Sequence, residues 1–194
     1  MSSGSTPISS ARNSSPLPCI ETPVDYVHHY KSPLGWITIA SDGTALVGLW
    51  FDKQRFFAAT LSSDQKERPL PIFEQAVRWL DLYFSGRNPG FVPQIALRTT
   101  EFRQEVCRIM LAIPYGRTMT YGKIAEIIAR QKGIPRMSAQ AVGGAVGHNP
   151  VSLIIPCHRV IGANSALVGY GGGLDRKSAL LSLEHADLSG DFVP

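Results

Sequence analysis

The spacing of apolar residues changes once along the chain, and this change limits the folds that the chain can adopt. Between residues 24 and 51, three short runs of strand-forming residues are separated by the turn sequences Ser-Pro-Leu-Gly at 32–35 and Ser-Asp-Gly at 41–43. Residues 73–84 then carry apolar side chains at helical spacing, and residues 95–97 form another short apolar run. The first part of the chain therefore predicts a small sheet of three or four strands with one helix across it.

From residue 98 onward the apolar spacing is helical, which indicates a mainly helical second domain. Thr120 and Ser138 are placed to cap two consecutive helices, because their side chains can accept a backbone N–H of the first turn. Those two helices are joined by a short break that contains glycine, which is typical of a helix-turn-helix. The predicted helices cover residues 102–113, 121–130, 139–146 and 175–186.

The predicted organisation is an α+β protein in which two domains lie between two tails. Residues 1–23 are rich in Ser, Thr and Pro and cannot bury enough apolar surface to offset their ordering entropy, so a disordered tail is predicted there. Residues 24–97 form a supporting domain, residues 98–187 carry the chemistry, and residues 188–194 form a C-terminal tail.

Composition limits the partners and the compartment. Lys and Arg outnumber Asp and Glu by 19 to 15, and the net charge of +4 permits a nucleic-acid partner without requiring one. The cysteines Cys19, Cys107 and Cys157 form no CxxC pair, so neither a disulfide framework nor a zinc knuckle is predicted. No apolar run approaches the roughly 18 residues that a membrane span needs, and the N-terminus lacks the pattern of a secretory signal. We expect a soluble protein of the reducing cytoplasm with no membrane partner.

One short stretch places a reactive group directly after a predicted strand. Residues 153–155 are apolar and suit a short buried strand, which Pro156 would end because proline lacks the N–H that a ladder needs. The next side chains are the thiol of Cys157, the imidazole of His158 and the guanidinium of Arg159. An adjacent base or cation lowers the pKa of a thiol and favours the nucleophilic thiolate. The alternative is an inert structural cysteine, because free cysteine is among the most buried residue types.

Glycine-rich segments lie on both sides of this stretch. Gly143 and Gly144 fall in the helix predicted over residues 139–146, where each glycine costs about 1 kcal/mol relative to alanine. Either this helix packs tightly against a neighbour, or its smooth face lies in a narrow nucleic-acid groove, and the sequence favours neither. The run Tyr-Gly-Gly-Gly at 170–173 lets backbone approach a flat ligand closely, but it lacks the Lys-Ser/Thr of a phosphate-binding loop.

Several short sequences in the second half carry a resemblance to a known family. They are Ile-Pro-Tyr-Gly at 113–116, Thr-Tyr-Gly-Lys at 120–123, Ala-Val-Gly-Gly-Ala at 141–145, Asn-Pro at 149–150, Pro-Cys-His-Arg-Val at 156–160 and Tyr-Gly-Gly-Gly at 170–173. With these, the chain resembles the O6-alkylguanine-DNA alkyltransferases, also known as methylated-DNA–protein-cysteine methyltransferases. The resemblance is close over residues 98–187 and loose over residues 24–97. It implies an RNase H-like first domain and a winged-helix-like second domain that contains the helix-turn-helix.

The resemblance also implies a single-turnover repair reaction. Cys157 would attack the alkyl carbon on O6 of a damaged guanine in DNA, leaving normal guanine and a thioether on the protein. His158 would act as base through a bound water and be oriented by Glu184. Tyr121 would protonate the departing base, and Asn149 would brace the turn behind the thiol. Thiolate is the strongest nucleophile among the side chains, and proton donation helps a guanine anion to leave.

For binding, the resemblance implies double-stranded DNA that carries O6-alkylguanine, and with it a monomeric protein that needs no cofactor. The target nucleotide must be flipped out of the duplex, while the small-residue helix lies in the minor groove. The base pocket would be formed by Pro156, Val160, Tyr170 and Gly171. The residues expected at the DNA are Thr120, Ser138, Ala139, Gln140, Ala141 and Gly143.

No metal site is expected, and O4-alkylthymine is a further candidate substrate. His28 and His29 are adjacent in a predicted strand, so their side chains point to opposite faces. Together with Cys19 they do not reproduce the spacing of a four-ligand zinc site.

Three other functions stay open: a protein that binds alkylated DNA without chemistry, a Cys–His hydrolase, and a structural protein with a buried cysteine. Relatives that only bind lack the cysteine, and a Cys–His hydrolase would need an oxyanion hole and a separate histidine.

Two positions depart from the family pattern. Gln140 stands where the family commonly places an arginine that fills the gap left by the flipped base, so the helix brings no charge there. Gly171 stands where some members carry serine, which leaves more pocket space and by hypothesis admits bulkier O6-alkyl groups.

We predict weaker DNA binding than in an arginine-bearing relative, because Gln140 lacks the charge that attracts phosphates. The substitution Gln140→Arg should tighten binding to an alkylated duplex in a titration. An unchanged affinity would count against the role assigned to position 140.

Overall fold

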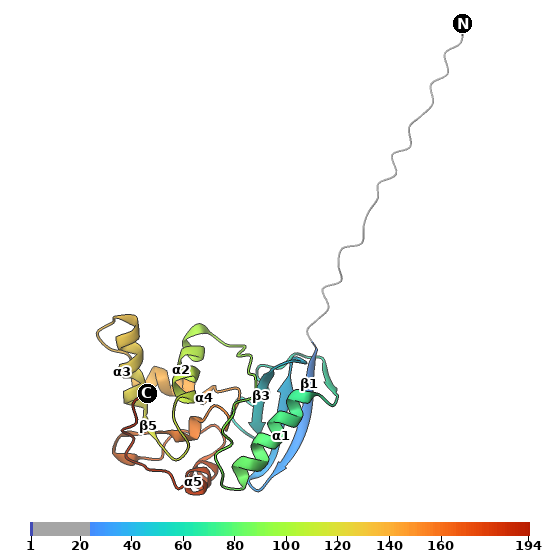
Figure 1. The fold of residues 1–194 in the computed structure, drawn as a ribbon. Helices are drawn as coiled ribbons and strands as arrows, with labels where there is room; N and C mark the ends of the chain where they lie inside the picture. Colours follow the sequence, from blue (N-terminus) through green and yellow to red (C-terminus); the bar gives the residue numbers. More distant parts are fainter. Residues whose placement is uncertain (2–23) are drawn as a thin grey trace.

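The computed structural model describes Met1 and residues 24–194, so the expectations for Cys19 and for nearly all of the N-terminal tail lie outside the described residues. A mixed sheet with one helix forms the first half of the described chain, and a group of helices forms the second half beside it (Figure 1). The α+β class is therefore confirmed. Within the described part, no helix is long and apolar enough to cross a bilayer.

The sheet is built around the two predicted turns. Its strands are β1 Asp25–Ser32, β2 Gly35–Ser41, β3 Leu46–Phe51 and β4 Gln65–Glu67. They lie in the order β3-β2-β1-β4, with antiparallel hairpins between β1 and β2 and between β2 and β3. β4 pairs with β1 in parallel, and its three residues are all exposed and polar. This strand was not predicted, because it has no apolar alternation that could reveal it.

The prediction of a strand at residues 95–97 is wrong. Ile95 makes only an isolated bridge to Leu46 of β3. The backbone of Leu46 donates to Gln94 and accepts from Ala96, both at 2.8 Å. The run is therefore held to the edge of β3 through a single residue, and it leaves the sheet before a ladder can form.

Helix α1, Pro71–Phe84, lies across one face of the sheet (Figure 1). It begins two residues before the predicted start, with a proline in its first turn, where the missing N–H costs nothing. On the opposite face Ala40, Val47 and Trp50 form a second small cluster. Since both faces are covered, all six residues of β3 are buried, and its sequence reads as a continuous apolar run.

The second half contains the predicted helices. They are α2 Glu101–Leu111, α3 Tyr121–Lys132, α4 Ala139–Gly147 and α5 Leu174–Leu183. Thr120 caps α3 by accepting from the Lys123 N–H, and Ser138 caps α4 by accepting from the Ala141 N–H, as predicted. A short parallel pair, β5 Met119–Thr120 and β6 Val160–Ile161, ties the start of α3 to the segment after Cys157. α5 ends three residues before the predicted position, and His185 just beyond it has a φ of 49°.

The two halves share one hydrophobic core. A single cluster of buried side chains runs from Ile37 and Leu80 in the first half to Ile124, Val146 and Leu180 in the second. Backbone bonds also join the halves, because Leu49 in β3 donates to Pro150 and accepts from Ser152, both at 2.8 Å. The segment that leads to Cys157 is therefore fixed against the edge of the sheet.

The predicted strand at residues 153–155 is a tight turn instead. Leu153 has a φ of 69°, in the left-handed region, and Ile155 donates its N–H back to the carbonyl of Val151 at 3.0 Å. An apolar run alone cannot distinguish a buried strand from a buried turn. The turn is followed by Pro156 and by a short 3-10 helix, Cys157–Arg159.

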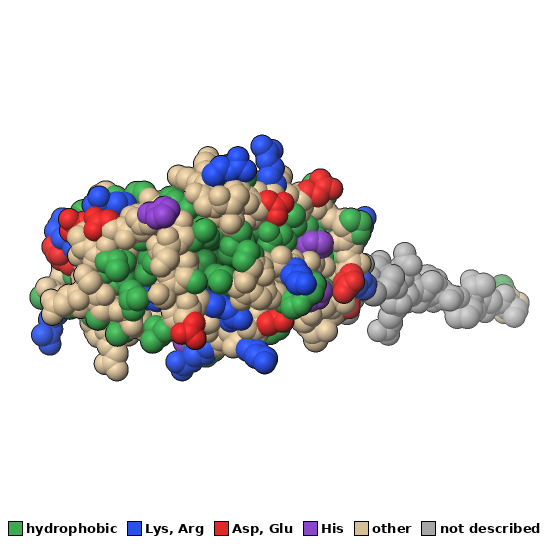
Figure 2. All heavy atoms as spheres, turned by 90° about the horizontal axis from the view of Figure 1, so that it is seen from below, with side chains coloured by type: hydrophobic (Ala, Val, Ile, Leu, Met, Phe, Trp, Pro, Cys, Tyr) green, Lys and Arg blue, Asp and Glu red, His purple; other side chains and the backbone are tan. Residues whose placement is uncertain are grey.

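The surface seen in Figure 2 carries hydrophobic side chains across its centre, with positive and negative side chains interspersed around them. The small positive net charge is not gathered into one patch on that face. This mixture of signs gives that face no strong electrostatic attraction for a polyanion.

The glycines of α4 are not required by packing inside the protein. A Cβ built on Gly144 or on Gly147 meets no atom within 4 Å. A Cβ on Gly143 makes only ordinary contact, at 3.9 Å, with the ring of Tyr121. Of the two explanations left open by the sequence, tight packing against a neighbouring helix is therefore excluded for Gly144.

Replacing Gly144 with alanine should stabilise the protein. The added methyl group meets no clash, and alanine lowers the conformational entropy of the unfolded chain, so the free energy of unfolding should rise by about 0.5–1 kcal/mol in urea denaturation. Gly133→Ala is the matched control and should destabilise, since Gly133 has a φ of 63° at the end of α3. A loss of stability in Gly144→Ala would show that α4 is more crowded than its geometry indicates.

Candidate active site

The thiol of Cys157 is held at the first position of the 3-10 helix, in a nearly closed environment. Only 4% of the residue is exposed, and its sulfur accepts a hydrogen bond of 3.1 Å from Nδ2 of Asn149. Burial raises the pKa of the thiol above its ordinary value, while the Asn149 amide and the Lys177 ammonium group act in the opposite direction. The resting thiol is therefore protonated at neutral pH, and it must lose its proton before it can act as a nucleophile.

Asn149 holds together the turn that presents the thiol. Besides the sulfur, its Nδ2 donates to the carbonyl of Ile155 at 2.8 Å, and its Oδ1 accepts from the N–H of Val151 at 3.1 Å. The amide group thus bonds to both ends of the tight turn and to the sulfur beyond it. The bracing role of Asn149 stays a prediction, and these three bonds are the contacts through which it would act.

The imidazole of His158 is fully buried next to a carboxylate. Its Nε2 lies 2.7 Å from Oε1 of Glu184. Burial lowers the pKa of His158 although the carboxylate favours the charged form, so the ring is neutral at neutral pH. Because a carboxylate only accepts hydrogen bonds, Nε2 carries the proton and Nδ1 carries the free lone pair. Within the described residues Nδ1 has no hydrogen-bond partner, and it is thus free to accept a proton.

The carboxylate of Glu184 is the acceptor at the centre of the site. Oε2 accepts from Nε of Arg159 at 2.8 Å and from the N–H of Gly116 at 3.1 Å. Oε1 accepts from Arg159 Nη2 at 3.0 Å and from the hydroxyl of Tyr83 at 2.7 Å, in addition to His158. Burial alone would raise the pKa of Glu184, but His158 and Arg159 together hold it well below its ordinary range. The carboxylate therefore stays ionised despite its burial.

Tyr83 and Arg159 belong to this network. No role was predicted for Tyr83 from the sequence, and the guanidinium of Arg159, expected as a cation beside the thiol, is bonded to Glu184 instead. Tyr83 comes from α1 in the first half, is fully buried, and also lies 3.2 Å from Nε2 of His158. Burial and the neighbouring carboxylate raise the pKa of Tyr83 well above its ordinary value, so its hydroxyl is always a donor. The sequence carries only a weak signal for this network. The phenol of Tyr83 lies on the apolar face of α1 and the guanidinium of Arg159 lies in an apolar stretch, and a polar group in such a place needs a buried hydrogen-bond partner.

A cleft of about 540 Å³ opens beside α4. Of the four residues expected to form the base pocket, Tyr170 and Gly171 line this cleft, whereas Pro156 and Val160 are buried and do not. Cys157, which is almost fully buried, does not line it either. The cleft is lined by Arg55, Tyr121, Ala139, Gln140, Gly143, Gly147, Val168, Gly169, Tyr170 and Gly171.

The phenol of Tyr121 points into the wall of this cleft. Its hydroxyl is directed at the carbonyls of Gly169, at 2.9 Å, and of Val168, at 3.2 Å. Burial raises its pKa to about 12, with a smaller effect from Cys157, so the hydroxyl remains a proton donor at neutral pH. Lys177 supports the same loop, because its Nζ donates to the carbonyls of Val160 at 2.6 Å and Val168 at 2.8 Å.

The residues expected at the DNA divide into two groups. Ser138, Ala139, Gln140 and Ala141 are exposed at the start of α4, and Gly143 lines the cleft below them. Thr120 is only partly exposed, and its hydroxyl oxygen is already occupied by the N–H of Lys123 at 3.1 Å. The structure therefore gives Thr120 a capping role and brings the other five residues together.

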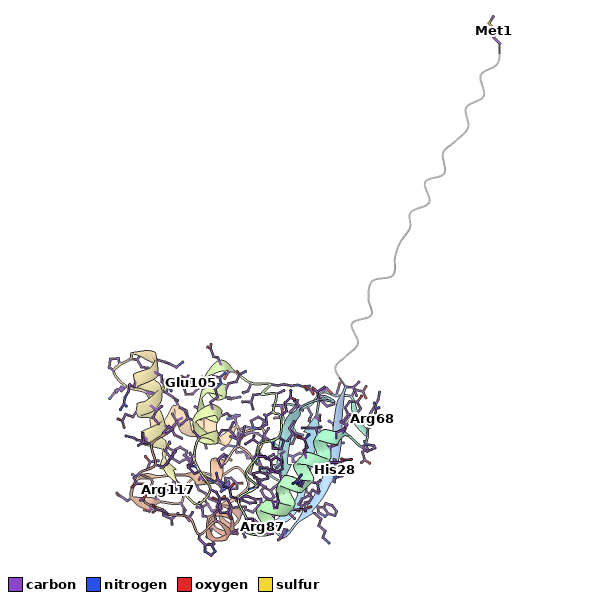
Figure 3. All side chains as sticks on the ribbon, viewed as in Figure 1. Met1, His28, Arg68, Arg87, Glu105 and Arg117 are labelled. Carbon is purple, nitrogen blue, oxygen red and sulfur yellow. The ribbon has the colours of Figure 1, made fainter. Side chains whose placement is uncertain are left out.

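No group of three or more His, Cys, Asp or Glu side chains suited to a metal ion is present among the described residues. His28 stacks on Phe73 of α1 with ring centroids 5.6 Å apart, and Figure 3 shows it between the sheet and that helix. Nδ1 of His29 is 3.2 Å from the hydroxyl of Thr38 on the neighbouring strand. Both side chains thus have partners within the sheet domain.

Comparisons with known proteins match both halves of the chain. The family profile described as "6-O-methylguanine DNA methyltransferase, ribonuclease-like domain" matches residues 26–92, and the DNA-binding domain of the same family matches residues 101–186. A methylated-DNA–protein-cysteine methyltransferase of Mycobacterium tuberculosis is 44% identical over 169 residues, covering 85% of this chain and 97% of the relative. One from Haemophilus influenzae is 38% identical, covering 82% of this chain and 86% of the relative.

Solved structures agree with the sequence matches. A crystal structure of Mycobacterium tuberculosis OGT in complex with DNA is 43% identical, with a TM-score of 0.70 over 83% of this chain and 92% of that chain. An O6-methylguanine DNA methyltransferase from Methanococcus jannaschii is 28% identical, with a TM-score of 0.56 over 82% of this chain and 94% of that chain. The fold and the site thus define a DNA-repair enzyme of the alkyl-transfer class. The chain belongs to the 6-O-methylguanine DNA methyltransferase family.

Removing the charge of Glu184 should destabilise the protein in a pH-dependent way. The pKa of this carboxyl is below its ordinary 4.5 in the folded protein, so its contribution is complete above pH 4.5 and is lost as the pH falls further. Glu184→Gln should lower the free energy of unfolding at pH 7 by about 3 kcal/mol, because buried Arg159 loses its partner. In urea denaturation, the difference from the unsubstituted protein should shrink between pH 5 and pH 3.

Glu126→Gln serves as the control for this experiment. Glu126 pairs with Lys123 and Arg130 on the exposed surface of α3, at 2.9 Å each, and such pairs contribute little. A difference for Glu184→Gln that stayed constant down to pH 3 would contradict the assignment of Glu184 as a buried charged acceptor.

Proposed function

We propose that Cys157 is the alkyl acceptor and that the substrate is O6-alkylguanine, with O4-alkylthymine as a further candidate, in double-stranded DNA. The thiolate attacks the alkyl carbon, a sulfur–carbon bond forms, and the bond from that carbon to O6 breaks. The electron pair of the broken bond passes to the guanine, which takes up a proton and stays in the DNA. No step regenerates the thiol, so each molecule reacts once. The observation that carries this proposal is that His158, which directly follows Cys157, is bonded to a buried carboxylate that three further groups hold in place.

The proton of Cys157 would pass to His158. This assignment is supported by the neutral state of the ring, by the free lone pair on Nδ1, and by the carboxylate that fixes the proton on Nε2. When His158 becomes an imidazolium ion, Glu184 stabilises the new positive charge. A water between Nδ1 and the sulfur would complete the path, as the family resemblance implies.

Tyr121 would donate a proton to the departing guanine. Its raised pKa keeps the hydroxyl protonated, and it lies on the cleft that is offered to the base. In the free protein the hydroxyl is bonded to the carbonyls of Val168 and Gly169, so the base must compete with these carbonyls. The donor is thereby kept protonated and oriented until a base enters the cleft.

The exposed face of α4 would lie in the minor groove while the target nucleotide is flipped into the cleft. This is supported by the short side chains of Ala139, Ala141 and Gly144, which leave Gln140 as the long side chain at the start of the helix. We also propose a monomer, as the family resemblance implies. A free thiol acceptor suits the reducing cytoplasm, where we place the protein.

A Cys–His hydrolase is not favoured by the site. His158 directly follows Cys157, and its Nε2 proton is fixed on a buried carboxylate, whereas acyl transfer uses a histidine from elsewhere in the chain and an oxyanion hole. A binding protein without chemistry is not favoured either, because Cys157 is present, and the next residue in the chain, His158, keeps a free lone pair on Nδ1.

Incubation with a duplex that contains O6-methylguanine should add one methyl group per protein molecule, measured by intact mass spectrometry. Peptide mapping should place that methyl group on Cys157, and Cys157→Ala should abolish the gain. Cys107→Ala is the matched control and should still react, because Cys107 is buried on α2 with its thiol pKa raised to about 12. More than one methyl group released per protein molecule would instead identify a turnover enzyme.

A further inference from the structure

A turn from the first half of the chain forms one wall of the cleft. It follows β3 and includes Lys53 and Phe56, whose φ angles of 61° and 60° lie in the left-handed region. Gln54 is buried in this turn, and its Oε1 accepts from the N–H of Phe51 at 3.2 Å and from the hydroxyl of Ser152 at 3.0 Å. The turn is thus bound to the segment that carries the reactive cysteine.

Two further contacts hold the turn against the second half. The N–H of Arg55 donates to the carbonyl of Gly171 at 2.9 Å, which joins it to the glycine-rich loop of the cleft. The ring of Phe56 stacks on the imidazole of His148 at the end of α4, with centroids 3.7 Å apart. Two hydrogen bonds and one stacked ring pair thus join the turn that carries Arg55 to three segments of the second half. Residues 24–97 were expected to form a supporting domain without a part in the site.

Arg55 is the one charged residue among those that line the cleft. Its side chain is exposed, its guanidinium lies 4.8 Å above the ring of Phe56, and within the described chain it forms no ion pair with a carboxylate. Helix α4, which also lines the cleft, has no charged residue from Ala139 to Gly147. The positive charge that α4 lacks at Gln140 is therefore present in the same cleft, on a different element.

A guanidinium in this position suits a phosphate. It presents parallel N–H donors that match phosphate oxygens, and the aromatic ring beneath it restricts its orientation. A nucleotide whose base enters the cleft brings its own backbone phosphates to the cleft mouth. O6 and N7 of guanine are the other acceptors that a guanidinium recognises.

We infer that Arg55 binds a backbone phosphate of the flipped nucleotide and so supplies, from the first half of the chain, the positive charge that α4 does not carry. This inference rests on the proposed function. It assigns to the sheet domain a direct part in holding DNA.

The experiment compares Arg55→Gln with Arg68→Gln, a matched control. Arg68 also lies over an aromatic ring, that of Tyr26 at 5.9 Å, but Figure 3 places it in the sheet domain, away from the helical half. Rates of methyl transfer to each full-length variant are measured by intact mass. The donors are a duplex containing O6-methylguanine, at several salt concentrations, and the free base O6-methylguanine.

Arg55→Gln should slow transfer from the duplex about tenfold at low salt, and the dependence of log rate on log salt should become shallower by about one, as expected for one lost phosphate contact. Transfer from the free base should be unchanged, since it has no phosphate. Arg68→Gln should match the unsubstituted protein in every measurement, and Arg55→Lys should keep the original salt dependence.

Equal slowing with duplex and free base would overturn the inference, because Arg55 would then act on the base or on pocket shape. An unchanged salt dependence in Arg55→Gln would overturn it as well. Failure of the unsubstituted protein to gain a methyl group would instead refute the proposed function, and that result does not depend on Arg55.

Discussion

A buried carboxylate with donors on every side is the constraint around which this structure is arranged. Taking Glu184 out of water would be unfavourable unless its negative charge were matched by Arg159 and by hydrogen bonds to both oxygens. Those donors come from α1, from the turn before β5 and from the 3-10 helix of the reactive cysteine. Elements distant in sequence must therefore pack together around Glu184. The bond from Nε2 of His158 to this carboxylate then fixes the orientation of the imidazole.

The burial of Cys157 has an effect opposite to the one usually sought for a nucleophile. Burial raises the pKa of the thiol, so the resting protein holds a protonated thiol on a residue that is only 4% exposed. Such a sulfur reacts slowly with small oxidants and electrophiles, whose attack depends on thiolate and on access. For a protein that can use its sulfur once, low reactivity in the absence of DNA preserves the molecule for its substrate.

The sequence predicted those parts of the fold that local patterns determine. The two hairpins follow from turn residues, and the starts of α3 and α4 follow from the hydroxyls of Thr120 and Ser138. Family resemblance predicted that Cys157, His158 and Glu184 act in one site, and the structure pairs His158 with Glu184. The parallel strand β4 and the contacts of Tyr83 and Arg55 could not be predicted, because each depends on partners far away in the sequence. The turn at residues 153–155 was missed because a short apolar run does not distinguish a strand from a turn.

The shared core has a consequence for how the chain could be divided. The matched domains meet near residues 92–101, where a cut looks natural from sequence alone. A fragment beginning there would keep the sulfur, yet it would leave the central carboxylate without its phenol and the cleft without one wall. It would also expose the edge where Leu49 pairs with residues 150–152. The two matched regions can be told apart by sequence, but they share one core and one cleft. A shortened chain designed for activity must therefore contain both.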